Sequence, residues 1–131
     1  MTQNEKYQSL CFEVVLALDE LVAAFRHFMH GSLTKRAEDK LLDALKSNSD
    51  EFEDLSLITK RTAAVMQDIY YDLTGDISTL KSIKKKVEEL GSILHIGRSH
   101  PEAAFRRVQM IKATFNERAL RKNNKAEATN R

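Results

Sequence analysis

The chain has 131 residues and a formal net charge of +2, with 31% charged and 7% aromatic residues. A length of this order fits a single domain, and so small a net charge does not indicate a polyanionic partner. Cys11 is the only cysteine, which excludes a disulfide within the chain and favours a reducing compartment. With few glycines, one proline and no tryptophan, the composition predicts an all-α fold, an elongated helical bundle or coiled coil.

The first predicted helix covers residues 7–30, where apolar residues recur at alternating steps of four and three. This stripe consists of Tyr7, Cys11, Val14, Leu18, Leu21, Phe25 and Phe28. Its last four members are expected either to fold back on the rest of the chain or to offer a surface to a partner. A shorter helix is predicted over residues 34–46, and a turn of small polar residues follows it.

A long central helix is predicted over residues 50–96, because one alternating register continues through this segment without a skip. The register comprises Phe52, Leu55, Thr59, Thr62, Met66, Ile69, Leu73, Asp76, Leu80, Ile83, Val87, Leu90 and Leu94. A lone helix cannot bury such a stripe, so we expect it to pair with other helices as a coiled coil.

Asp76 is the one acidic member of this register, and Gly75 lies beside it. A buried, unpaired carboxylate is unfavourable, so Asp76 is expected to meet a cation or to lie at a local opening. Because Gly75 also lowers helix propensity, the two residues predict a weak point or bend that can set register or partner choice.

The register and the first stripe together supply the residues expected to bind partner helices. These residues are Leu55, Met66, Ile69, Leu73, Asp76, Leu80, Ile83, Val87, Leu90, Leu18, Leu21, Phe25 and Phe28.

Gly97 is expected to end the central helix, and a last helix is predicted over residues 100–121. Ser99 and Glu102 have the spacing of a capping box. Pro101 suits the first turn of a helix, which supports this start.

The final residues, 123–131, are polar and are expected to form a disordered tail, which leaves one helical domain over residues 1–122. The polar start of the chain does not resemble a signal peptide, and no apolar run reaches the length of a membrane span. We therefore expect a cytoplasmic protein that associates with a membrane only through a complex.

The sequence contains no catalytic, cofactor-binding or metal-binding constellation that we recognise. His27 and His30 share a helix face but lack the carboxylate ligands that accompany histidines in bundle metal sites. Cys11 lies on the apolar stripe, where a buried small side chain is expected rather than a nucleophile. A non-enzymatic protein without cofactor or metal is therefore predicted.

Two segments between residues 50 and 105 resemble a known family. Asp72-Leu73 closes a helical run, and the run His-Pro-Glu-Ala-Ala-Phe follows from His100. This is similar to the KxDL subunit of BORC, the BLOC-one-related complex, with its Lys-x-Asp-Leu motif in a heptad helix and a His-Pro-Glu-Ala-Phe segment downstream. Tyr70 stands where that family has Lys, and one alanine is additional. The resemblance implies a small helical subunit, without activity of its own, of an adaptor complex on the cytosolic surface of lysosomes.

The function favoured by these patterns is assembly: a coiled-coil subunit or adaptor that pairs with partner helices in a homo- or hetero-oligomer. One alternative is a self-contained bundle that binds a target protein through a groove, as a chaperone, effector or inhibitor does. Another is a nucleic-acid-associated helical protein that uses the lysines at 84–86 and the basic C-terminal end.

Overall fold

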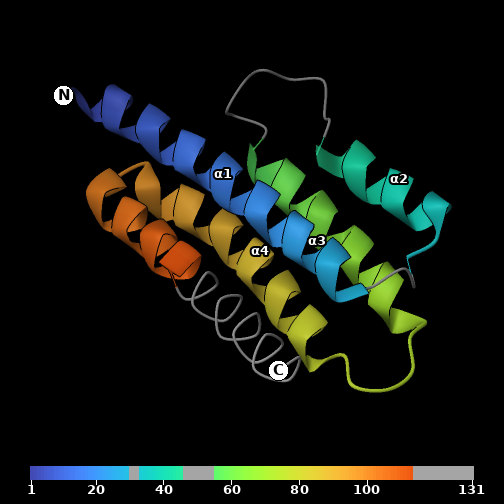
Figure 1. The fold of residues 1–131 in the computed structure, drawn as a ribbon. Helices are drawn as coiled ribbons and strands as arrows, with labels where there is room; N and C mark the ends of the chain where they lie inside the picture. The colour runs from blue at the N-terminus through green and yellow to red at the C-terminus, as the bar shows by residue number, and fades with distance from the viewer. Residues whose placement is uncertain (30–32, 46–54, 114–131) are drawn as a thin grey trace, which may run out of the picture.

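A computed structural model describes residues 1–29, 33–45 and 55–113 of the chain (Figure 1). Its helices are α1 (Gln3–Met29), α2 (Lys35–Leu45), α3 (Leu55–Tyr71), α4 (Ser78–Gly97) and a helix over residues 101–113, called here the C-terminal helix. All regular structure within the described residues is helical, and the helices lie side by side in an elongated bundle. The predicted all-α bundle is confirmed.

The prediction of one long central helix over residues 50–96 is wrong. Helix α3 ends at Tyr71, a turn occupies residues 72–77, and α4 then runs back along α3 (Figure 1). Gly75 has a φ of 98° in this turn, a conformation that L side chains rarely adopt. The physical reason for the break is that a hairpin lets the two halves of the apolar register cover each other within one chain.

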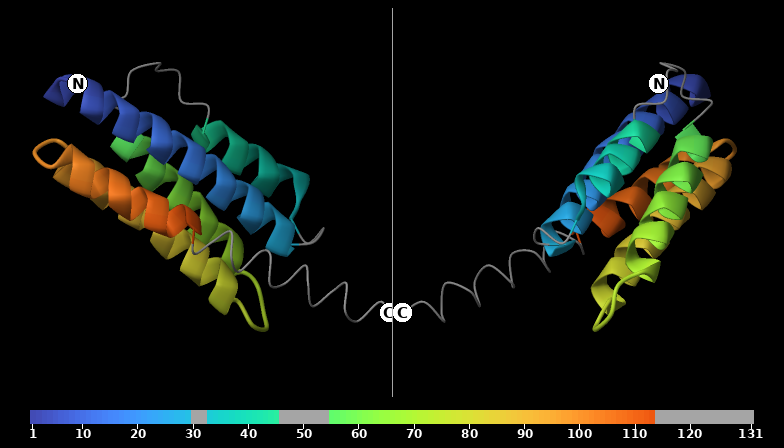
Figure 2. Two further views of the ribbon diagram at one scale, coloured as in Figure 1. Left: turned by 60° about the vertical axis from the view of Figure 1, so that its left-hand side comes forward. Right: turned by 90° about the vertical axis from the view of Figure 1, so that its right-hand side faces the viewer.

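Helix α4 packs against α3 on one side and α1 on another. The C-terminal helix folds back on α4 after a short turn over residues 98–100 (Figure 2). Gly97 lies where three helices meet: a Cβ there would touch Leu10 on α1 and lie 3.3 Å from the Cβ of Ala104 on the C-terminal helix. The lack of a side chain at Gly97 therefore allows both helices to approach the same end of α4.

The core runs along α4 and receives side chains from every described helix. Leu10, Leu41, Met66, Leu90 and Val108, one from each helix, are all fully buried. Burial of apolar side chains along the whole length of the bundle is the main source of its stability.

Threonine hydroxyls begin the first two helices. The hydroxyl of Thr2 accepts a hydrogen bond from the Glu5 backbone N–H at 3.1 Å, so α1 starts earlier than the apolar stripe predicts. Thr34 does the same for the N–H of Ala37 at 3.1 Å, at the start of α2.

The C-terminal helix begins at Pro101, one residue after the predicted start, and lacks the expected capping box. The Ser99 hydroxyl instead donates a hydrogen bond to the carbonyl of Ile96, at the end of α4. The first residues of the predicted central helix, 50–54, and the predicted tail over 123–131 lie outside the described residues.

Candidate functional site

The chain's own helices cover most of the residues predicted to bind a partner. Buried members are Leu18, Leu21 and Phe25 on α1, Leu55 and Met66 on α3, and Leu80, Ile83, Val87 and Leu90 on α4. The remaining members are Phe28, Ile69 and Leu73, which are half-buried, and Asp76, which is exposed. Helix pairing within one chain thus occupies most of the register, and a role for these residues in binding a partner stays a prediction.

Asp76 lies in the α3–α4 turn rather than inside a helix pair. Its carboxylate accepts a hydrogen bond from the backbone N–H of Ser78 at 3.0 Å, at the first residue of α4. This hydrogen bond holds the pKa of the Asp76 carboxyl below its ordinary value. Asp76 therefore lies in an ordered turn between two helices, where the sequence predicted a local opening of the helix pair. Its carboxylate stabilises the start of α4.

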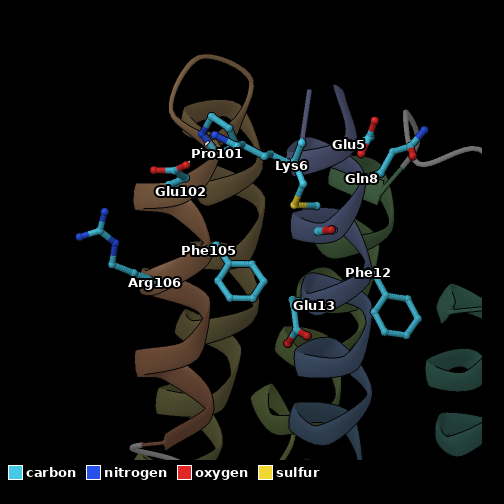
Figure 3. A pocket seen from close by; sticks show the side chains of 11 residues that line it. Glu5, Lys6, Gln8, Phe12, Glu13, Pro101, Glu102, Phe105 and Arg106 are labelled. Atoms are coloured by element: carbon cyan, nitrogen blue, oxygen red, sulfur yellow. Dashed lines mark hydrogen bonds and ion pairs between the residues drawn. The ribbon is translucent and has the colours of Figure 1, made fainter. Parts of the chain in front are cut away.

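An open groove of about 910 Å³ lies between the first turns of α1 and of the C-terminal helix (Figure 3). We call it the N-terminal groove. Its lining residues are Met1, Glu5, Lys6, Gln8, Ser9, Phe12, Glu13, Pro101, Glu102, Phe105 and Arg106.

The two walls of the N-terminal groove are parallel helices in a constant register. Lys6 forms an ion pair with Glu102 at 2.6 Å, and the Glu13 carboxylate accepts a hydrogen bond from Gln109 at 2.9 Å. Each of these contacts joins residues 96 positions apart. The walls are therefore fixed to each other at both ends of the groove.

Glu13 also pairs with Lys112 at 3.1 Å, and both side chains are about one-fifth exposed. Partial burial reduces screening by solvent, so this pair contributes more than a surface pair does. At the other end, the Lys6 ammonium beside Glu102 lowers the pKa of that carboxyl.

Two aromatic side chains give the groove its apolar character. Phe12 on α1 is 57% exposed, whereas Phe105 on the C-terminal helix is half-buried against the core. Figure 3 shows Phe105 pointing into the space between the helices and Phe12 on the other flank of α1. Exposed aromatic rings are characteristic of protein interaction surfaces.

Neither Phe12 nor Phe105 is among the residues that the sequence predicts to bind a partner. Phe12 lies between Cys11 and Glu13, outside the apolar stripe that packs in the core. One sequence signal could have indicated Phe12: it is an aromatic residue that lies outside the buried stripe of an amphipathic helix. That Phe12 and Phe105 border one groove depends on the fold-back at the turn over residues 98–100, which the sequence does not specify.

The N-terminal groove combines apolar and ionisable side chains. Its ionisable groups are carboxylates, Lys6 and Arg106, and two of them are paired with each other. Within the described ranges, no three side chains of the metal-ligating types are grouped closely enough to hold an ion. Cys11 is fully buried, as predicted, and burial raises the pKa of its thiol.

Comparisons with protein-family models, curated proteins and solved structures give no match to this chain. In the part of the chain that the structure describes, no helix combines the length and the apolar character needed to cross a membrane.

Proposed function

We propose that the chain is a self-contained helical bundle that binds one helix of a partner protein in the N-terminal groove. The observation that carries this proposal is the large exposed fraction of Phe12, 57%, at the edge of an open groove that also contains Phe105. The remaining apolar surface of these rings is removed from water when a partner covers it.

A helix is the occupant that fits this shape. The walls are themselves two parallel helices, and a third helix can lie over the exposed face of α1, from the flank that carries Phe12 to the border with the C-terminal helix, by packing its side chains into their surface. The α1 wall from Gln3 to Glu13 is about 15 Å long at ~1.5 Å per residue, which matches roughly three helical turns. A partner helix with apolar residues at positions i, i+3 or i+4, and i+7 therefore matches the groove.

Pairing of a partner with the α3–α4 register, the assembly function favoured by the sequence, requires the hairpin to open. Opening would expose Met66 and Leu90, both fully buried. The groove needs no such rearrangement, which is why we prefer it. An adaptor role in organelle positioning, implied by the KxDL resemblance, stays a prediction and is compatible with helix binding.

Nucleic-acid binding is less well supported. Lys84 and Lys86, in the basic run of α4, form ion pairs with Glu88 and Glu89 on the same helix. Two of the three lysine charges are thus already balanced locally.

A library of displayed amphipathic helical peptides tests the proposal. Peptides selected on the unchanged protein are re-measured on Phe12→Glu and on Leu57→Glu, a control at an exposed apolar residue, 43% exposed, on α3. We expect selected peptides to lose at least about tenfold in affinity on Phe12→Glu. They should bind Leu57→Glu as they bind the unchanged protein.

Two outcomes contradict the proposal. One is a selection that enriches no helical peptide. The other is a set of enriched peptides whose affinity is the same on Phe12→Glu as on the unchanged protein. Circular dichroism of the variant excludes unfolding as the cause of a lost interaction, since Phe12 does not belong to the core.

A further inference from the structure

A second groove, of about 470 Å³, lies between α2 and α3. We call it the α2–α3 groove. Its lining residues are Met29, Leu33, Thr34, Arg36, Ala37, Lys40, Val65, Asp68, Ile69, Asp72 and Leu73. Ile69 and Leu73 belong to the apolar register from which the sequence predicts partner binding, and both are only half-buried here. The chain's own helices therefore leave these two side chains partly exposed to solvent.

The two rims of the α2–α3 groove carry opposite charges. Arg36 and Lys40, one turn apart on α2, form a basic rim, and Asp68 and Asp72, one turn apart on α3 and just after it, form an acidic rim. All four side chains are exposed. Among the described residues, none of the four forms an ion pair or a side-chain hydrogen bond.

The floor between the rims is apolar. Leu33, Val65, Ile69 and Leu73 each pack against the core on one side and remain partly exposed on the other. A strip of this kind between two charged rows has the pattern of a helix-pairing surface, with an apolar centre and charged flanks that select the partner.

We propose that the α2–α3 groove is the interface between two copies of this chain. Charge complementarity between the two rims favours a second copy as the occupant. When a second copy is turned by 180° about an axis along the groove, α2 of each copy lies against α3 of the other. The basic rim of each copy then meets the acidic rim of the other, and the two apolar floors face each other.

The alternative face-to-face arrangement, with the axis across the groove, places basic rim on basic rim and acidic rim on acidic rim. Like charges brought together are destabilising, so the charge pattern selects the first arrangement. Four helices, two from each copy, then surround one apolar centre, as in a four-helix bundle built from two helical pairs.

The size of the face indicates a reversible dimer. Helix α2 has 11 residues. At ~1.5 Å per residue and ~10 Å per helix diameter, the two-helix face measures roughly 300 Å² in projection. Two facing copies cover roughly 600 Å² in projection, below the about 1,200 Å² or more that stable specific interfaces bury in total. We therefore expect a concentration-dependent equilibrium between monomer and dimer.

Charge reversal gives a sharp test, measured by sedimentation equilibrium over a range of concentrations. An acidic variant, Arg36→Glu with Lys40→Glu, and a basic variant, Asp68→Lys with Asp72→Lys, should each be monomeric where the unchanged chain dimerises. Mixed in equal amounts, the two variants should form a heterodimer, because each rim again meets its opposite. The chain with all four substitutions should regain the homodimer.

A matched control reverses two exposed lysines on α4, Lys81→Glu with Lys85→Glu, and should leave the dimer unchanged. Phe12→Glu should also leave it unchanged, since the N-terminal groove is a separate surface; this separates the dimer from the function proposed above. A monomeric unchanged chain at millimolar concentration overturns the proposal. So does a dimer whose dissociation constant is the same in the acidic variant, or a variant mixture that stays monomeric.

Discussion

Gly91 on α4 faces Thr59 on α3 so closely that a Cβ at position 91 would lie 2.8 Å from the Thr59 hydroxyl oxygen. That hydroxyl is fixed, because it donates a hydrogen bond to the carbonyl of Ser56 at 2.7 Å and is fully buried. The two halves of the hairpin therefore touch through a glycine and a small β-branched residue. The missing side chain at Gly91 therefore lets α4 come close to α3 at the end of the hairpin opposite the turn.

We expect Gly91→Ala to destabilise the bundle although alanine is the better helix former. The clash costs about 1–3 kcal/mol, because Thr59 is stiff at χ1 and has no space to move. The gain in helix propensity is about 1 kcal/mol. Denaturant unfolding should therefore show a lower free energy of unfolding for Gly91→Ala.

The effect of Gly91→Ala on the free energy of unfolding should change sign in a Thr59→Ala background. With the hydroxyl gone, the nearest atom at position 59 is its Cβ, 3.8 Å from the added methyl group, an ordinary contact. Gly91→Ala should then stabilise the protein by about 1 kcal/mol through helix propensity alone. Equal effects in both backgrounds would show that the two residues do not touch.

Much of the fold follows from patterns that the sequence displays. The apolar stripe of α1 and the helix end at Gly97 are where the periodicity and the glycine place them. The register through Asp76 also marks residues that are largely buried, but it does not distinguish pairing between chains from pairing within one chain. The same spacing serves both, and the choice depends on whether Gly75 turns the chain.

The sequence does not predict the N-terminal groove, for a different reason. It joins residues 96 positions apart, and no local signal at Phe12 or Phe105 encodes that separation. The sequence predicts part of the α2–α3 groove. Ile69 and Leu73 line this groove, and they belong to the apolar register from which partner binding was predicted.

Gly75→Ala should destabilise the protein by about 1–2 kcal/mol. The cause is the backbone conformation, since φ is 98° and no atom lies within 4 Å of an added Cβ. Thr74→Ala, at an exposed neighbour in the same turn, is the control and should change little. A fully retained free energy of unfolding in Gly75→Ala would mean that the turn does not require its present backbone conformation.

Asp76→Ala should lower stability at neutral pH, and the difference from the unchanged protein should disappear in acid. The folded pKa of Asp76 is depressed below its ordinary value of 3.8, mainly by the hydrogen bond from Ser78. A depressed carboxyl pKa contributes stability above its unfolded value, and this contribution is lost as pH falls through the folded pKa. Thermal unfolding of both proteins between neutral pH and strong acid measures the difference. Thr74→Ala, an uncharged change in the same turn, should show no such dependence on pH.

The contact of Glu13 with Gln109 and Lys112 should hold the C-terminal helix against α1. Glu13→Ala removes the acceptor of both hydrogen bonds and should cost about 1–2 kcal/mol, since the groups are largely shielded from solvent. Amide hydrogen exchange of residues 104–112 should become faster, more than that of α3. Glu102→Ala, at the exposed Lys6 pair, should have a smaller effect. Unchanged exchange in Glu13→Ala would show that core packing alone fixes this helix.

Cys11 offers a measure of whether the bundle opens as a unit. Its thiol is fully buried between core residues of α1, and burial raises its pKa, so both access and thiolate fraction are low in the folded chain. Labelling by an aromatic disulfide reagent should therefore be slower than in urea by about a thousandfold or more, the ratio set by a free energy of unfolding of ~5 kcal/mol. Gly91→Ala acts on the distant α3–α4 contact. If α1 separates only when the whole bundle unfolds, this variant should accelerate Cys11 labelling in proportion to its loss of stability. If labelling is fast or indifferent to Gly91→Ala, α1 detaches on its own, and the α1 wall of the N-terminal groove is not rigid.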